Sequence, residues 1–219
     1  EQSIAALPDV LNLAAAGGLD MGTAADIATN AMSGMRLQVS DLTRITDVFA
    51  KTASSSNTNV AAMGESFKYV ASIGASAGVS VERLSVMIGI LGNAGIQGSM
   101  AGTQLAFGIS KMASEGKDFF EVLKELERTG ADTAEVMDIF GERAGRAVLA
   151  ILGQGIGTLE QFEAQLMNSA GAAEEMARIM SDNLAGDAKN LSSAIEAVRI
   201  NFFDVFNDDL RAGIQAVTG

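Results

Sequence analysis

Residues 84–110 read LSVMIGILGNAGIQGSMAGTQLAFGIS, and no charged residue occurs anywhere in this stretch. Small residues interrupt its apolar positions at close intervals. The stretch allows two structures: a membrane-crossing hairpin, or two helices in water that pack through glycine faces and are joined by a turn. Close packing through small residues explains the same glycines in either solvent. The candidate helix-packing residues are Gly89, Gly92, Gly95, Gly98 and Gly102.

The polar residues inside the stretch decide between these structures. A transmembrane helix needs about 20 mainly apolar residues. Asn93, Gln97 and Ser99 interrupt the apolar run, and the glycine-rich residues 95–99 predict a turn. Charged helical patterns flank the stretch on both sides. We therefore favour a soluble hairpin, with membrane insertion as the alternative.

Composition limits the chemistry that this chain can perform. The 219 residues include no Cys, no His and no Trp. The absence of His removes the commonest general base and transition-metal ligand, so a serine triad or a metallohydrolase is not expected. The 27 acidic and 15 basic residues give a net charge of −12, and the basic residues do not cluster. We expect no catalytic residues, no cofactor, no metal and no direct nucleic-acid binding.

Apolar residues recur at three- and four-residue spacing along nearly the whole chain, which predicts an all-α fold of about eight to ten short helices. Ser40, Ser80, Asp132 and Thr158 are candidate helix N-caps. Candidate C-terminal caps are Gly18, Gly78, Gly130 and Gly171. Residues 1–186 should form a compact multi-helix domain, with a candidate sub-boundary near the Ser/Thr/Asn-rich residues 51–59 and a second linker candidate at residues 153–157.

The last segment, residues 187–219, predicts a longer amphipathic helix. Five apolar residues alternate steps of four and three, which is the spacing of a coiled-coil seam. One interpretation is a helix that packs on its own domain, and the other is a self-association helix that begins a rod. The candidate self-association residues are Leu191, Ile195, Val198, Phe202 and Val205.

Two short motifs match sequence motifs of serine acyl hydrolases. Residues 114–117 (SEGK) fit S-x-x-K, and residues 181–183 spell S-D-N. The K-T-G element that accompanies them in β-lactamases is missing, and no sheet is predicted to hold it. The acidic pairs Glu174–Glu175 and Asp208–Asp209 are expected on solvated helix faces, because adjacent helical residues point apart. We interpret the two serine motifs as chance matches and the two acidic pairs as solvated helix faces.

Several blocks of the sequence resemble the core region of phage tail tape measure proteins, most clearly over residues 37–105. The most specific block is ILGNAGIQGSMAGTQL at residues 90–105. The other blocks are LTRITDVFAKTA (42–53), MGESFKYV (63–70), AGVSVERL (77–84), FGERAGRA (140–147) and SAGAAEEMARIM (169–180).

The resemblance implies a non-enzymatic structural protein that acts in tail length determination, tail assembly and genome ejection. It implies partnership with the tail tube protein, tail assembly chaperones and tail-tip proteins, and homo-oligomer formation. The expected location is the lumen of the virion tail, with the host cytoplasm during assembly. A membrane contact at ejection, or a DNA-passage pore formed by residues 84–110, is the alternative function. Because the chain begins with Glu1, we expect a portion of a longer protein.

Overall fold

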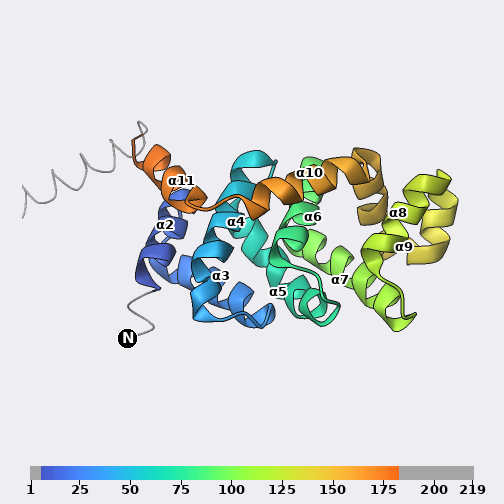
Figure 1. The fold of residues 1–219 in the computed structure, drawn as a ribbon, viewed down its shortest axis with the longest axis horizontal. Coiled ribbons are helices and arrows are strands. Elements are labelled where there is room, and N and C mark those ends of the chain that lie inside the picture. The colour runs from blue at the N-terminus through green and yellow to red at the C-terminus, as the bar shows by residue number, and fades with distance from the viewer. Residues whose placement is uncertain (1–5, 183–219) are drawn as a thin grey trace, which may run out of the picture. The chain divides into compact units, whose positions relative to one another are not determined.

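The computed structural model describes residues 6–182, and the fold within this range is all-α. It contains ten α-helices, one 3-10 helix and no strand (Figure 1). The expected all-α, compact multi-helix fold is confirmed, while the predicted terminal helix at residues 187–219 lies outside the described residues. The elements are α2 (Leu7–Gly17), α3 (Met21–Gly34), η1 (Val39–Asp41), α4 (Leu42–Ser55), α5 (Val60–Ser76), α6 (Val81–Asn93), α7 (Gly98–Ser114), α8 (Phe119–Thr129), α9 (Thr133–Gln154), α10 (Ile156–Met167) and α11 (Ala172–Ser181).

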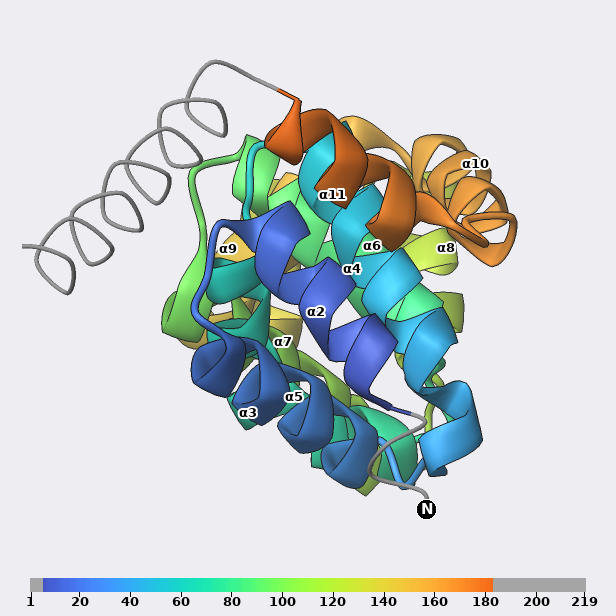
Figure 2. The ribbon, with the colours of Figure 1, turned by 90° about the vertical axis from the view of Figure 1, so that its left-hand side faces the viewer.

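The chain divides into two units, Glu1–Arg178 and Ile179–Gly219, and the helices described here belong almost entirely to the first. Within the first unit, α5 makes its most extensive contact with α7 and a second one with α3. Helix α2 packs on both α3 and α4, as Figure 2 shows. Helix α6 contacts α4 and α10, and helix α7 contacts α9.

One hydrophobic cluster runs through the helices from α2 to α10. Phe49 of α4 and Phe67 of α5 belong to this cluster, with ring centroids 4.7 Å apart and both side chains buried. A smaller cluster joins α2, α4 and α11 through Ala16, Ala50 and Ala173. Burial of these apolar side chains is the main force that holds the short helices together, since short helices are marginal alone.

Local sequence signals explain several helix ends. Ser80 accepts a hydrogen bond from the Arg83 N–H, and Asp132 accepts one from the Glu135 N–H, so both predicted N-caps are confirmed. Gly130 ends α8 in the left-handed conformation with φ 68°, as predicted.

Two predicted N-caps are wrong. Ser40 lies inside η1, where the Asp41 carboxylate accepts from the Gln38 N–H instead. Thr158 lies inside α10, which begins two residues earlier. There the Ile156 N–H donates to the Glu127 carboxylate at 2.7 Å, so a side chain from α8 replaces a local cap.

The two predicted linkers are shorter than their composition indicates. Helix α4 continues through Ser55, and Thr52 is fully buried, so only residues 56–59 connect α4 to α5. Between α9 and α10, Gly155 alone separates the helices. Helix α9 also contains a kink at Gly141, where φ is 71° and ψ is 173°. A glycine tolerates this conformation without a steric penalty.

Candidate functional site

The uncharged segment at residues 84–110 forms most of α6 and α7, joined by residues 94–97. Its large apolar side chains are built into the core. Leu84, Met87, Leu91, Leu105 and Ile109 are each at most 1% exposed. The glycines of the segment therefore lie on helices that are surrounded by other helices.

The two predicted helix-packing glycines of α6 face α4 and the connection that follows it. A Cβ atom on Gly89 would lie 3.0 Å from the Ser56 hydroxyl and 3.1 Å from the ring of Phe162. A Cβ atom on Gly92 would lie 2.8 Å from the carbonyl oxygen of Asn57. Backbone cannot move away as a flexible side chain can, so Gly92 permits a close helix-to-backbone approach.

Gly102 of α7 makes the closest approach of the segment. A Cβ atom there would lie 2.2 Å from the carbonyl oxygen of Ser66 in α5 and 2.8 Å from two other backbone atoms of that residue. The Ser66 hydroxyl, which is fully buried, donates to the Gly98 carbonyl oxygen at 2.8 Å. Helices α5 and α7 thus meet backbone to backbone around this pair.

Of the other two predicted packing glycines, Gly95 lies in the connection and Gly98 is the first residue of α7. Gly95 has φ 78° and Gly98 has φ 58°, and a Cβ atom on either would meet nothing closer than 3.9 Å. The five glycines therefore do not converge on one surface. Those on α6 face α4, while Gly102 faces α5, so the hairpin packs outward on its neighbours and only weakly on itself.

None of the helices formed within residues 6–182 combines the length and apolar character needed to cross a membrane. The predicted self-association residues at positions 191–205 lie outside the described residues.

The serine motifs are not assembled into a site. The Ser114 hydroxyl donates to the Lys111 carbonyl oxygen at 2.7 Å, while the Lys117 ammonium pairs with Glu115 at 2.8 Å. The Lys117 amine therefore does not contact the serine that it would activate. Ser181 ends α11 and Asp182 follows it, while Asn183, the last residue of the motif, lies outside the described residues.

The acidic pairs likewise form no metal site among residues 6–182. Glu175 pairs with Arg178, and this hydrogen bond lowers the pKa of the Glu175 carboxyl. The second predicted pair, at positions 208–209, lies outside the described residues.

A buried carboxylate ties α6 to α10. Glu163 is 6% exposed, and both of its oxygens accept from the Arg83 Nε at 3.0 Å. The same guanidinium lies 4.3 Å from the centre of the Phe120 ring in α8. This cluster satisfies a charge that would otherwise be costly to bury. The cluster joins α6, α8 and α10.

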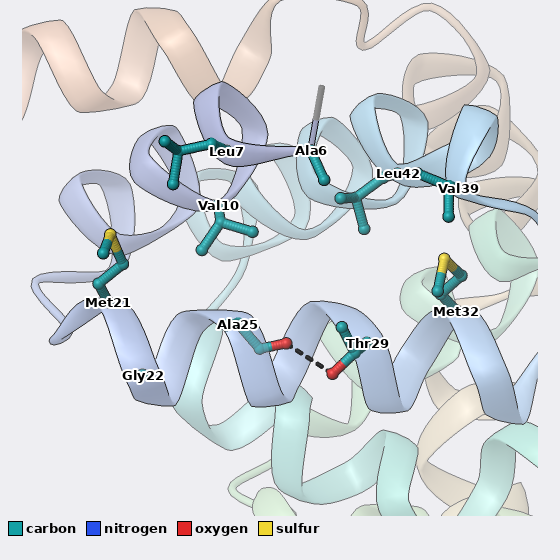
Figure 3. A pocket seen from close by; sticks show the side chains of 10 residues that line it. All are labelled: Ala6, Leu7, Val10, Met21, Gly22, Ala25, Thr29, Met32, Val39 and Leu42. Atoms are coloured by element: carbon teal, nitrogen blue, oxygen red, sulfur yellow. Dashed lines mark hydrogen bonds between the residues drawn. The ribbon is translucent and has the colours of Figure 1, made fainter. Parts of the chain in front are cut away.

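An apolar pocket lies between α2, α3 and the start of α4, with a volume of about 470 Å³ (Figure 3). In Figure 3 the side chain of Val10 extends from α2 toward α3, and Met32 of α3 lies opposite Val39. The Thr29 hydroxyl bonds to the Ala25 carbonyl oxygen at 2.7 Å, so it is already satisfied. The pocket offers apolar contact and no titratable group. Its lining residues are Ala6, Leu7, Val10, Met21, Gly22, Ala25, Thr29, Met32, Val39 and Leu42.

The described part of the chain is therefore an all-α domain. The packing glycines and the Arg83–Glu163 pair in it make contacts between helices. Comparison with known proteins supplies the family. The phage-related minor tail protein family matches residues 1–201, so this chain belongs to the phage-related minor tail protein family.

Two curated relatives extend over almost the whole chain. The "Tape measure protein" of Pneumococcus phage Dp-1 is 30% identical over 97% of this chain. The "Probable tape measure protein" of Escherichia phage P2 is 32% identical over 98% of it. The chain spans only 21% and 30% of the lengths of these two relatives. No solved structure matches.

Proposed function

We propose that this chain is a segment of a tape measure protein, a structural and non-enzymatic component of a phage tail. The observation that carries the proposal is the alignment of nearly the whole chain with tape measure proteins named for a Pneumococcus phage and an Escherichia phage. The proposed roles are tail length determination, tail assembly and genome ejection. Membership of a minor tail protein family places the protein among tail components.

The proposed partners are the tail tube protein, tail assembly chaperones and tail-tip proteins, together with other copies of the chain. The proposed location is the lumen of the virion tail, reached from the host cytoplasm during assembly. Self-association through Leu191, Ile195, Val198, Phe202 and Val205 is part of this proposal and rests on their coiled-coil spacing.

We further propose that residues 6–182 act as a folded module and that other parts of the full protein do most of the measuring. As one continuous helix these residues would span about 270 Å at a rise of about 1.5 Å per residue. They instead fold back repeatedly into short helices around a common core. The close contacts at Gly89, Gly92 and Gly102 support a compact arrangement over an extended one.

The pore alternative at residues 84–110 gains no support from the fold. Its large apolar side chains pack within the protein core, as Leu84 and Leu105 illustrate. Opening the hairpin toward lipid would expose this core to water. Contact with a membrane at ejection stays a prediction.

Electron microscopy of phage tails tests the proposed role. An in-frame deletion of about 100 codons from the remainder of the gene, outside this segment, should shorten the tails by about 150 Å, because a ruler that is helical contributes about 1.5 Å per residue. The control is a synonymous recoding of the same region. Tails of unchanged length in the deletion phage would argue against a tape measure.

A further inference from the structure

A second pocket, between α7 and α9, has a polar and basic lining and a volume of about 520 Å³. We call it the α7–α9 pocket. It lies on the side of α7 that the core does not use. Its lining residues are Ser99, Met100, Thr103, Gln104, Glu142, Arg143 and Arg146.

The two arginines of this pocket are exposed and have no acidic partner. Across residues 6–182, neither Arg143 nor Arg146 has a carboxylate within ion-pair distance, whereas Arg44, Arg83 and Arg128 each do. Arg143 and Arg146 are three positions apart on α9, so they share one helix face. In a chain of net charge −12, two unpaired guanidinium groups in one pocket form a local basic site.

The surface beside the arginines is apolar. Phe107 is 44% exposed, and its ring lies 4.8 Å from the guanidinium carbon of Arg143, which restrains that side chain over the aromatic face. Met100, one of the pocket residues, is 51% exposed. Arginine, aromatic residues and methionine are the types enriched at protein–protein contacts.

We propose that the α7–α9 pocket binds a carboxylate-bearing segment of a partner polypeptide. The guanidinium groups of Arg143 and Arg146 donate charge-assisted hydrogen bonds to the carboxylate. Met100 and Phe107 pack against an apolar side chain next to that acidic residue. The partner is therefore a chain in which an acidic residue has apolar neighbours.

The charges favour a polypeptide carboxylate over a nucleic acid. Glu142 lines the same pocket and would repel a second negative group. Nucleic-acid backbones need several clustered cations, and the chain carries 27 acidic against 15 basic residues. A second copy of the chain is disfavoured as the occupant because each copy carries a net charge of −12. This inference does not depend on the tape measure role, since its test requires no tail.

NMR of the whole 219-residue chain tests the proposal through the arginine Nε–Hε signals. The probes are the peptide acetyl-GLELG-amide, its neutral counterpart acetyl-GLQLG-amide, and decathymidylate. We expect the acidic peptide to shift the signals of Arg143 and Arg146, and the neutral peptide to bind at least about tenfold more weakly. The double variant R143Q/R146Q should lose binding about tenfold or more. The control K111Q on α7 removes one positive charge against two in the double variant, lies outside the pocket, and should bind within about twofold of the parent.

Other results overturn the proposal. These are no shift with the acidic peptide, equal affinity for both peptides, or equal loss of binding in K111Q. Tighter binding of decathymidylate than of the acidic peptide would make the pocket a nucleic-acid site. Shifts of the same signals on raising the protein concentration alone would make a second copy the occupant. Far-UV circular dichroism of each variant confirms that the helices are retained.

Discussion

The Asp47 carboxylate in α4 accepts a hydrogen bond from the Ala173 N–H at 2.9 Å, 126 positions later in the chain. Its second oxygen accepts from the Gly171 N–H at the same distance. Asp47 is 4% exposed, so both bonds are shielded from water. Because Gly171 has no side chain with which to cap a helix, the cap of α11 comes from α4. This contact anchors the start of α11 to α4.

Replacing Asp47 with Ala should destabilise the fold by about 1–3 kcal/mol, because two backbone N–H groups lose a buried acceptor. Urea unfolding measures the loss, and hydrogen exchange should accelerate at the Gly171 and Ala173 amides before other regions. The matched control is Asp26→Ala, since Asp26 is exposed in α3. Unchanged exchange at both amides in Asp47→Ala would show that the carboxylate does not hold α11.

Gly102→Ala tests the contact between α5 and α7. The added Cβ would meet Ser66 backbone atoms at 2.2–2.8 Å, so the two helices must separate. Overpacking of this kind costs about 1–3 kcal/mol or more. Thermal unfolding should show a clear drop in midpoint.

The matched control is Gly153→Ala in α9, where a Cβ meets nothing within 4 Å. There the substitution should stabilise the helix by about 0.5–1 kcal/mol, because alanine has the higher helix propensity. Equal midpoints for the two variants would mean that α5 and α7 do not approach closely at Gly102.

Arg83→Ala should leave the buried Glu163 carboxylate without its partner. The expected loss is about 2–3 kcal/mol, below the value for a fully buried pair because the Arg83 side chain is 34% exposed. The double variant Arg83→Met/Glu163→Leu should recover most of this loss, since neither charge then remains. Urea unfolding of the single variants Arg83→Met and Glu163→Leu and of the double variant gives the coupling energy. Additive losses in the two single variants would contradict a direct pair.

Arg128→Gln should raise the pKa of the exposed Glu125 carboxyl. The Arg128 hydrogen bond holds this pKa below the ordinary value of 4.5. A carboxyl group whose pKa is lowered in the folded state stabilises the fold at pH values above its ordinary pKa. This stabilisation is lost as the pH falls through the lowered pKa. Carbon NMR titration of the glutamate side chains measures the shift.

Glu175 provides the internal control for that titration, because its pKa is lowered by Arg178 and should not respond. Unfolding at neutral pH should change little, since exposed pairs contribute little. A constant Glu125 pKa in Arg128→Gln would contradict the hydrogen bond.

Features set by neighbouring residues could be predicted from the sequence. The caps at Ser80 and Asp132 depend only on a side chain and an amide three positions later. The all-α class follows from the three- and four-residue spacing of apolar positions. The uncharged segment at residues 84–110 was correctly assigned to two helices and a turn.

Features that depend on distant residues could not be predicted. Nothing near Thr158 indicates that Glu127 supplies the acceptor at the start of α10. Asp47 lies among the apolar residues of α4, and its burial is explained only by α11. Arg143 and Arg146 belong to the block FGERAGRA, and their i, i+3 spacing is the sequence signal that could have indicated a basic site. Which helices pack against one another depends on the whole hydrophobic core, so local sequence patterns do not predict it.

Tail length in a phage that carries a tandem duplication of codons 6–182 tests the central claim, that this segment is a folded module of a tape measure protein. A duplication of equal length in the remainder of the gene serves as the control and should lengthen tails by about 270 Å. The account predicts that duplicating residues 6–182 adds far less than that control, because each copy folds compactly. Tails about 270 Å longer than normal would show that these residues are extended and counted, and would contradict the account.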